Sequence, residues 1–428
     1  MNQQLSSSAA ALAQDSINNE RLQAFIASLA TFGGRADGGV SRETLTDIDL
    51  ASRRYLIDQA RALGCEVMVD DCANLFFRRP GQRNDLPAVL TGSHGDTQPV
   101  GGKLDGAYGV VAGLEVIAAL NDAGINTLRP IEVVAWTNEE GSRFGPGAMG
   151  SSAFVDPSCL TGYLDAVDQN KVRFSEALQA ALDSTPDVPR CAMQRPMSAC
   201  VELHIEQGPV LERAGIPLGV VTGIQAVRWF SVTCHGSMAH AGTTPMDERR
   251  DAMAAAVALA QKLYDFAAAE TANQLRLTLG RWQVTPNSVN TIPGRVDFTV
   301  DMRCLTDSVL DRFEAFLRGL AAESSDSVSL ERFFQRAPTH FPRPMLELIQ
   351  TAAERACKHA GLPAPMPITS GAFHDAMYLA DHCPTAMIFV PSIKGISHNA
   401  AEATDPRDLL LGVQALAYTV TALANQKP

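Results

Sequence analysis

The sequence predicts an α/β protein in which a compact βαββαβ domain interrupts a larger domain. From residue 87, short apolar runs alternate with helical stretches, the order typical of a mainly parallel sheet. Between residues 224 and 336 the order becomes strand, helix, strand, strand, helix, strand, which is the ferredoxin-like arrangement. Helix and strand alternate again afterwards. We therefore expect a discontinuous first domain, residues 1–223 and 337–428, around an inserted domain, residues 224–336.

The elements of the first domain follow from the spacing of apolar residues. PAVLTGSH (87–94) and PIEVVAWTNEE (130–140) are β-rich runs that end in polar residues. The stretch between them, 109–124, has apolar side chains at helical spacing and closes on Gly124. MLELIQTAAERACKHAG predicts a later helix and TAMIFVPS a later strand. Because functional residues gather at the carboxyl ends of parallel strands, the polar ends of these runs are the places to look for chemistry.

The inserted domain shows both the alternating pattern of a half-buried strand and the helical spacing of apolar residues. In GRVDFTVDMRC (294–304), apolar and charged residues alternate, as in a strand with one buried face. Two stretches repeat apolar residues at helical spacing, residues 247–270 and 308–324. The remaining strands are predicted at 226–236, 275–286 and 327–334.

Composition excludes several classes of partner. The chain has 35 lysines and arginines against 47 aspartates and glutamates, a net charge of −12, and no basic run. This charge disfavours nucleic acid and anionic membranes, so we expect a small-molecule partner. The nine cysteines are scattered without paired spacing and read as reduced thiols. The N-terminal stretch lacks a basic region ahead of its alanines, so we expect a cytoplasmic protein without a secretory signal.

Nearly all of the unusually dense clusters of polar side chains lie in four segments, residues 92–109, 137–152, 202–212 and 395–402. Each lies at or near the end of an apolar run. Together they supply imidazoles and carboxylates without cysteine, a ligand set suited to Zn²⁺, Mn²⁺, Co²⁺ or Ni²⁺. Five ligands with a shared carboxylate would hold two ions. The residues concerned are His94, Asp96, Asp105, Glu139, Glu140, His204 and His398.

The local sequence suggests how these side chains divide the work. His94 ends a strand, and Asp96, two residues on, could orient its imidazole through the second ring nitrogen. Asp105 lies in a glycine-rich turn, where the backbone can approach closely. Glu139 and Glu140 are adjacent and point in different directions, so one can bind a metal while the other acts as a base. Each of these features, taken alone, could also be an ordinary loop or a solvated surface charge without a catalytic role.

Taken together, these segments resemble the signature blocks of the M20 metallopeptidase superfamily, in its hydantoinase/carbamoylase branch. The resemblance runs from about residue 20 to residue 420. It implies a mixed-sheet, metal-dependent hydrolase domain with a dinuclear centre. The implied ligands are His94, Asp105, Glu140, His204 and His398, with Asp105 bridging two Zn²⁺ or Mn²⁺ ions, and Co²⁺ or Ni²⁺ as other options. It also implies that Glu139 is the general base.

The resemblance extends to the inserted domain, which would serve as a lid and a dimerisation domain. Its segments HGSMAHAGTTP, NSVNTIPG and VDMRC match the family at His240, Asn290 and Arg303. These residues, with Gln207 and Gly371, would contact the substrate, and His240 would also stabilise the oxyanion. Arg303 offers a planar fork suited to a carboxylate. A salt bridge from Arg303 to Asp301 or Asp297 is the simpler alternative.

Two positions depart from the family pattern. Gly95 stands where a bulky aliphatic residue is usual, and Phe373 stands where glycine is usual. A benzyl group beside the mouth of the site could narrow it, so the substrate of any one relative does not transfer directly. His374 and Asp375 follow Phe373 and could support the site or be structural.

The resemblance favours hydrolysis of the carbamoyl C–N bond of an N-carbamoyl amino acid, of the L-α or β-ureidopropionate type, to amino acid, CO₂ and ammonia. Allantoate amidohydrolase is the nearest alternative, because it would use the same site residues and differ only in the pocket for the substrate side chain. An M20 aminoacylase or peptidase is disfavoured by His204 and by Asn290 with Arg303. A silent metal- or ligand-binding protein is disfavoured by Glu139, since such a protein has no use for a base. A homodimer through the inserted domain is also expected.

Overall fold

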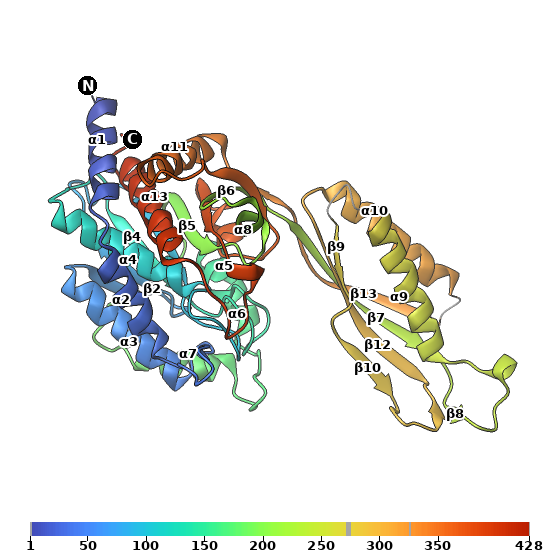
Figure 1. Ribbon diagram of the computed structural model, residues 1–428. Coiled ribbons are helices and arrows are strands. Elements are labelled where there is room, and N and C mark those ends of the chain that lie inside the picture. The colour runs from blue at the N-terminus through green and yellow to red at the C-terminus, as the bar shows by residue number, and fades with distance from the viewer. Residues whose placement is uncertain (1, 271–274, 325–326, 428) are drawn as a thin grey trace. The chain divides into compact units, whose positions relative to one another are not determined.

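The computed structural model describes residues 2–270, 275–324 and 327–427. Residues 1, 271–274, 325–326 and 428, which the predicted domains include, lie outside the described residues. The chain divides into two units (Figure 1). The first unit comprises Met1–Thr222, Phe341–Ile368 and His374–Pro428, and the second comprises Gly223–His340 and Thr369–Phe373.

A mixed sheet forms the centre of the larger domain, which confirms the mixed-sheet α/β part of the predicted fold class. Among the described residues, nine strands follow the order β1-β2-β4-β3-β5-β16-β6-β14, with β15 also paired to β6. The inner pairs β4–β3, β3–β5 and β5–β16 are parallel, whereas the outer pairs are antiparallel. The strands are β1 (Glu66–Val69), β2 (Leu75–Arg79), β3 (Ala88–His94), β4 (Ile131–Trp136), β5 (Met197–Ile205), β6 (Gly219–Ile224), β14 (Thr339–His340), β15 (Met366–Ser370) and β16 (Thr385–Val390).

Two apolar helices pack on this sheet. The predicted helix at 109–124 is α4 (Ala107–Asp122), which contacts β3, β4 and β5 and is buried from Ala107 to Leu120. The C-terminal helix α13 (Pro406–Ala424) contacts β16 and α4. Burial on all sides matches their apolar composition. The other helices of the first unit are α1 (Asn2–Asp15), α2 (Asn19–Ala30), α3 (Asp47–Ala62), α5 (Met149–Val155), α6 (Ser158–Tyr163), α7 (Phe174–Asp183), α8 (Val210–Ala214), α11 (Arg343–His359) and α12 (Ala376–Leu379), with the short turn η3 (Ile393–Gly395).

The second unit contains the helices and strands expected between residues 224 and 336. Its sheet has the order β10-β12-β7-β13, and β9 also pairs with β12. The prediction of one strand over residues 275–286 is wrong, because two strands, β9 and β10, pair with β12 there. Between them, the backbone N–H of Arg281 donates to the side-chain oxygen of Thr299 at 3.2 Å and not to a backbone carbonyl of β12. The elements are β7 (Ala226–His235), β8 (Ala239–His240), η1 (Met246–Glu248), α9 (Ala252–Ala269), β9 (Arg276–Thr278), β10 (Trp282–Thr285), β11 (Thr291–Ile292), β12 (Arg295–Cys304), α10 (Asp307–Glu323) and β13 (Val328–Arg336).

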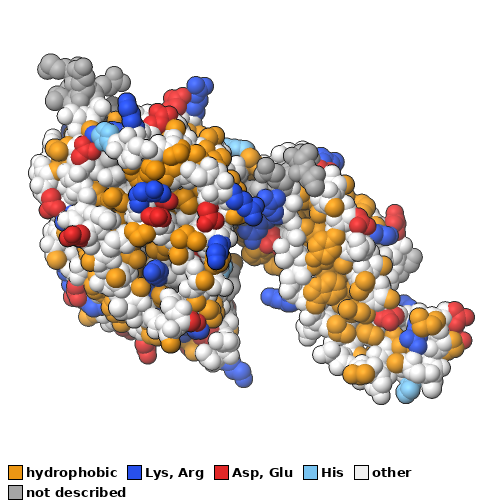
Figure 2. Space-filling view, viewed as in Figure 1, with side chains coloured by type: hydrophobic (Ala, Val, Ile, Leu, Met, Phe, Trp, Pro, Cys, Tyr) orange, Lys and Arg blue, Asp and Glu red, His pale blue; other side chains and the backbone are white. Residues whose placement is uncertain are grey.

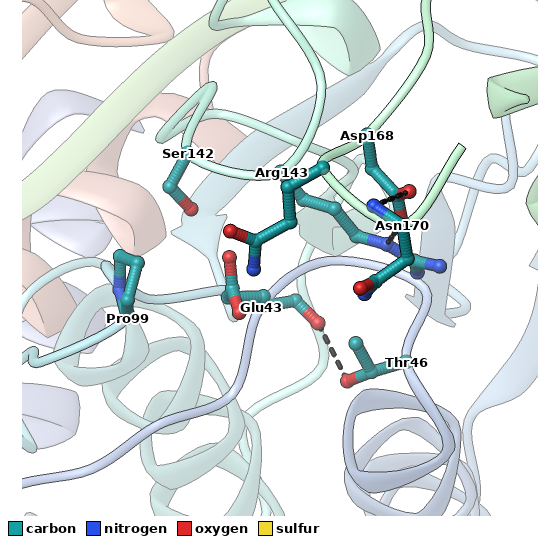
Figure 3. A pocket seen from close by; sticks show the side chains of 8 residues that line it. Glu43, Thr46, Pro99, Ser142, Arg143, Asp168 and Asn170 are labelled. Carbon is teal, nitrogen blue, oxygen red and sulfur yellow. Dashed lines mark hydrogen bonds and ion pairs between the residues drawn. The ribbon is translucent and has the colours of Figure 1, made fainter. Parts of the chain in front are cut away.

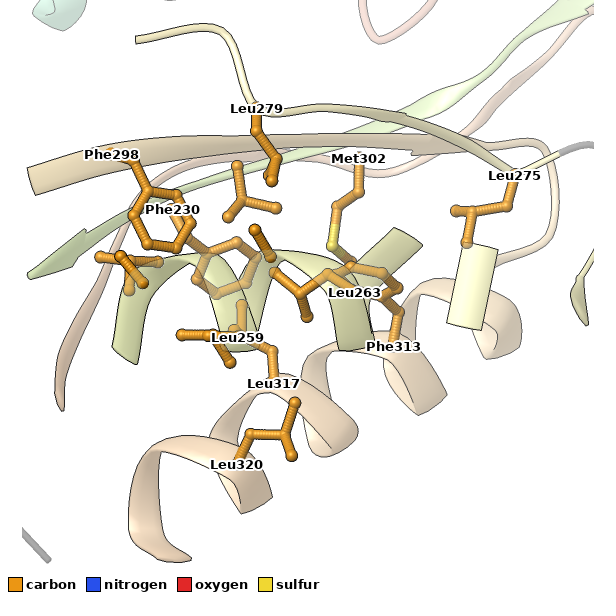
Figure 4. Packing of buried hydrophobic residues seen from close by; sticks show 14 of the residues in the cluster. Phe230, Leu259, Leu263, Leu275, Leu279, Phe298, Met302, Phe313, Leu317 and Leu320 are labelled. Carbon is orange, nitrogen blue, oxygen red and sulfur yellow. The ribbon is translucent and has the colours of Figure 1, made fainter. Parts of the chain in front are cut away.

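The core of the second unit lies between its sheet and the helices α9 and α10 (Figure 4). On β12, Phe298 and Met302 point into this core together with Phe230, Leu263 and Phe313 from the other elements. Burying side chains of this size stabilises a domain by about 1.5–3 kcal/mol each. The alternating residues of β12, Arg303 among them, lie on the opposite face of the sheet.

On the face drawn in Figure 2, acidic and basic side chains are interspersed. Among the described residues, no helix is both long enough and apolar enough to cross a membrane.

Candidate metal and catalytic site

The five predicted ligands come together in the first unit, in two groups that share Asp105. We call His94, Asp105 and His204 the first ligand group, and Asp105, Glu140 and His398 the second ligand group. His94 ends β3, His204 lies near the end of β5, and Asp105 precedes α4. The parallel pairing of β3 with β5 and β4 brings these strand ends to one edge of the sheet.

The spacing of the ligand atoms fits divalent metal ions. In the first ligand group, Asp105 Oδ1 lies 3.2 Å from His204 Nε2 and 3.6 Å from His94 Nε2. In the second, His398 Nε2 lies 3.2 Å from Asp105 Oδ2 and 3.4 Å from Glu140 Oε2. Ligand atoms at the usual distance from a tetrahedral zinc ion are roughly 3.3–3.6 Å apart. The two oxygens of Asp105 therefore face different groups, as a bridging carboxylate requires.

Both buried imidazoles are oriented by backbone carbonyls. His94 Nδ1 lies 2.9 Å from the Asp96 carbonyl oxygen, and His204 Nδ1 lies 2.9 Å from that of Ile205. A proton on Nδ1 leaves a lone pair on Nε2, the nitrogen nearer to Asp105. On His204, this nitrogen also accepts the backbone N–H of Gly106 at 3.1 Å. The Asp96 carboxylate does not orient His94 as expected, because it stays 3.8 Å from Nδ1. It instead accepts the backbone N–H groups of Glu139 and Glu140, at 3.3 Å each, and so positions that loop.

Glu139 is buried next to the first ligand group. Its Oε2 lies 3.6 Å from His94 Nε2, next to the first ligand group. Burial raises the pKa of Glu139 well above the usual range, and nearby carboxylates add to this shift against the opposing charge of His94. For Glu140, burial and the Asp105 carboxylate raise the pKa to about 7. A raised pKa suits a carboxylate that accepts and returns a proton near neutral pH.

The loop that carries Glu139 and Glu140 is anchored on its far side. Arg143 donates through Nε to Asp168 at 3.0 Å and through one terminal nitrogen to the Thr44 carbonyl at 2.8 Å. Arg143 and Asp168 border a pocket of about 160 Å³, which Glu43 and Ser142 also line (Figure 3). The pocket contains none of the predicted ligands. Its walls fix the position of the loop.

Three residues of the site adopt a left-handed backbone conformation. Asn138, Gln207 and His398 have φ values of 56°, 56° and 53°. Such conformations cost of order 1–3 kcal/mol each in non-glycine residues and cluster at functional sites. One glycine is required by close approach, because a Cβ on Gly106 would lie 2.3 Å from His94 Nε2. The chain thus holds an unfavourable local geometry around the two ligand groups.

The predicted substrate contacts fall into three places. Gln207, in the first unit, donates through Nε2 to Asp105 Oδ2 at 2.9 Å, and its buried Oε1 has no partner among the described residues. In the second unit, His240 and Asn290 lie together, since His240 pairs with Thr291 across β8 and β11. His240 is exposed, and its Nδ1 accepts the backbone N–H of Gly242 at 3.1 Å.

Arg303 lies on the polar face of its strand but is already occupied. Its guanidinium donates to Asp301 at 2.9 and 3.1 Å and to the Gly371 carbonyl oxygen at 3.1 Å. The structure therefore brings Arg303 and Gly371 together, and it contains the salt bridge that was the simpler alternative. A substrate carboxylate would share this guanidinium with Asp301.

The two departures from the family pattern lie in different units. Gly95, in the first unit, is buried, yet a Cβ placed on it would meet nothing within 4 Å. The position thus has room for a side chain that this chain lacks. Phe373, in the second unit, has its ring centroid 6.1 Å from that of Phe334.

Comparison with known proteins decides the family. Residues 90–422 match the peptidase family M20/M25/M40. The chain belongs to this family.

Relatives of this M20-family chain include two curated enzymes that match nearly its whole length. An N-carbamoyl-L-amino acid amidohydrolase of Geobacillus stearothermophilus is 39% identical over 96% of this chain and 99% of its own length. An allantoate amidohydrolase of Escherichia coli is 36% identical over 93% of this chain and 96% of its own. The solved structure of an amidase of the hydantoinase/carbamoylase family from Burkholderia multivorans is 42% identical with a TM-score of 0.84, and the match covers 96% of this chain and 98% of that one.

The M20 assignment makes the chain a metal-dependent hydrolase, in agreement with its two candidate ligand groups. Sequence reasoning missed several polar residues around these groups, of which Glu202 and Glu402 are buried. Glu202 accepts the Ser93 hydroxyl beside His94, and Gln98 donates to Glu140 at 2.7 Å. Glu402 and Ser397 contact Asp105. The only sequence signal for Glu202, Ser397 and Glu402 was their place inside the same polar segments.

Proposed function

We propose that this chain is an amidohydrolase that cleaves the carbamoyl C–N bond of N-carbamoyl amino acids, of the L-α or β-ureidopropionate type, and releases ammonia and CO₂. The observation that supports this most is a buried carboxylate with a raised pKa, Glu139, beside two ligand groups that share Asp105. Hydrolysis of an unactivated amide needs both a base and electrophilic assistance. The names of the relatives favour N-carbamoyl amino acids, and the allantoate amidohydrolases among them make allantoate the alternative substrate.

Two divalent ions are proposed, Zn²⁺ or Mn²⁺, with Co²⁺ or Ni²⁺ also compatible with the donors. The first ligand group would hold one ion and the second ligand group the other, with Asp105 common to both. When bound, the ions would supply Lewis acidity toward a water molecule and the carbamoyl oxygen. The mixture of imidazole nitrogens and carboxylate oxygens suits these metals better than Ca²⁺ or Mg²⁺.

The protein's own groups would move the protons. Glu139 would take a proton from the attacking water and pass it to the leaving nitrogen, a role that its position beside His94 allows. His240 would donate a hydrogen bond to the developing oxyanion. Asp96 would hold the backbone of Glu139 in place through its two N–H contacts. This assigns catalysis to Glu139 and His240 and a positioning task to Asp96.

The substrate carboxylate would be held by residues of the second unit. Asn290 and Arg303 are proposed as its ligands, with Gly371 beside Arg303 and Gln207 contacting the ureido end. A guanidinium can bind a carboxylate through two parallel hydrogen bonds, which an ammonium cannot reproduce. Asp301 would then keep the guanidinium oriented between substrates.

Replacing Arg303 by lysine should lower kcat/KM by about 10- to 100-fold, because the two-bond geometry is lost while the charge remains. Steady-state ammonia release from an N-carbamoyl amino acid measures this effect. The control is the amide-capped substrate, which lacks the carboxylate. It should react poorly with wild type but lose little more with Arg303→Lys. Equal further losses for both substrates would mean that Arg303 does not contact the carboxylate.

We further propose that the second unit, with residues 224–336 as its main part, is a ferredoxin-like lid and that it forms a C₂ homodimer. Its sheet order and alternating helices support this assignment. Strand β13 lies at the edge of the sheet, where a symmetry mate could add its own strand. In such a dimer, His240 would act in the site of the partner subunit.

Ammonia release across a substrate panel tests the proposed function. Metal-free protein reloaded separately with Mn²⁺, Zn²⁺, Co²⁺ or Ni²⁺ is assayed with N-carbamoyl-L-amino acids, N-carbamoyl-β-alanine and allantoate, and amino-acid release is assayed with N-acetyl amino acids. We expect the highest kcat/KM with an N-carbamoyl amino acid. Preference for allantoate would select the alternative. Reaction of the acetyl compounds alone would contradict the carbamoyl assignment.

A further inference from the structure

A buried carboxylate outside the ligand groups holds the backbone of the bridging aspartate. Glu402 is only 4% exposed. Its Oε1 accepts the backbone N–H groups of Leu104 at 2.9 Å and of Asp105 at 3.1 Å. Two N–H groups on one buried oxygen fix the turn that carries Asp105, because each would otherwise remain unsatisfied at a cost of about 1–3 kcal/mol.

The turn is shaped around this carboxylate. A Cβ added to Gly102 would lie 2.0 Å from Glu402 Oε1, so a side chain at position 102 would displace Glu402. Glycine allows the backbone before Asp105 to approach the carboxylate directly. The segment GGKLDG is therefore fitted to Glu402 as well as to the ligand that it carries.

Ser397 connects Glu402 with one oxygen of Asp105. The Ser397 hydroxyl lies 3.0 Å from Glu402 Oε2 and 2.9 Å from Asp105 Oδ2. Oδ2 is the oxygen that faces His398, whereas Oδ1 faces His94 and His204. Ser397 thus contacts only the half of the Asp105 carboxylate that belongs to the second ligand group.

We propose that Ser397 and Glu402 are positioning residues for the bridging aspartate. Ser397 sets the affinity of the second ligand group for its ion and leaves the first ligand group largely unaffected, whereas Glu402 supports both groups through the backbone of Asp105. Glu402 fixes the Asp105 backbone, and Ser397 directs Oδ2 toward Glu140 and His398. Neither residue needs to touch the substrate. The inference rests on the proposed function only in assuming that both ligand groups bind metal.

The test is a titration of metal-free protein with Co²⁺. Calorimetry measures the affinity for each ion during the titration, and visible absorption reports the coordination of each ion. Wild type should bind two ions per chain. Ser397→Ala should bind the first ion within about threefold of the wild-type affinity and the second about 10- to 100-fold more weakly, the usual cost of losing a hydrogen bond to a metal ligand. Ser397→Thr keeps the hydroxyl and should restore the second affinity. Glu402→Ala should weaken the binding of both ions, because the Asp105 backbone that it holds serves both ligand groups.

Thr404→Val is the matched control. Thr404 donates its hydroxyl to the Pro391 carbonyl oxygen at 2.8 Å, in the same part of the chain, without contacting Asp105. The Thr404→Val variant should bind both ions like wild type.

The proposal is overturned if Ser397→Ala binds both ions like wild type, if Ser397→Ala weakens the binding of both ions equally, or if Thr404→Val reproduces the effect of Ser397→Ala. Wild type that binds fewer than two ions would overturn this proposal and the dinuclear centre together. Two-ion binding without ammonia release would contradict the proposed function alone.

Discussion

Glu139→Gln should lose about 10²- to 10⁴-fold in kcat while the metal content stays near the wild-type value. Glutamine has nearly the same shape as glutamate but cannot accept a proton from water at neutral pH. Glu139 lies beside His94 without belonging to either ligand group, so its amide should leave the metal ligands in place. Ammonia release and metal analysis on the same preparation measure both quantities.

The adjacent residue provides the control. Glu140 belongs to the second ligand group, at 3.4 Å from His398 Nε2. Glu140→Gln should therefore lose metal as well as activity, which separates the two neighbouring carboxylates by their roles. If Glu139→Gln retained substantial turnover, or if it lost its metal like Glu140→Gln, the assignment of Glu139 as the base would be wrong.

The dimer population formed when Glu139→Ala and His240→Ala are co-expressed should recover about a quarter of wild-type activity. Each variant alone should be nearly inactive, because one lacks the base and the other lacks the oxyanion donor. If His240 acts in the partner subunit, each mixed dimer has one site with both residues intact. Random pairing makes about half of the dimers mixed, and half of the sites in these are complete.

The same experiment distinguishes the alternative arrangement. If His240 serves its own subunit, every site in the mixture lacks one of the two residues and activity should stay at the level of the single variants. Co-purification through two different affinity tags isolates the mixed dimers, which should then show about half of the wild-type activity. Inactive mixed dimers would exclude action in the partner subunit.

The elements of the fold were predictable where apolar periodicity decides the structure. The alternating residues of β12 and the apolar stretch of α4 gave the correct type of element. Periodicity was less reliable for the buried face of α9. Helical spacing places Val257 and Tyr264 on the same face as Ala256, Ala260 and Leu263, yet they are 52% and 46% exposed, whereas Leu259 is buried. A helix rich in alanine leaves its orientation to the packing of neighbouring elements.

The grouping of the ligands was predictable because polar residues at strand ends meet at one edge of a parallel sheet. The supporting contacts were not, since they run from side chains to the backbone of distant segments. The Asp96 carboxylate bonds N–H groups 43 and 44 residues away. Glu402 bonds an N–H group 297 residues away, at Asp105. Such partners depend on loop conformation, for which the sequence has no periodic signal.

Ammonia release as a function of bound metal tests the central claim most directly. Metal-free wild type is titrated with Mn²⁺ in the presence of an N-carbamoyl-L-amino acid, and bound ions and released ammonia are measured at each step. The account predicts no release without metal and a rise that reaches its maximum when two ions are bound per chain. Release by the metal-free protein, or full activity before any ion occupies the groups that share Asp105, would contradict it.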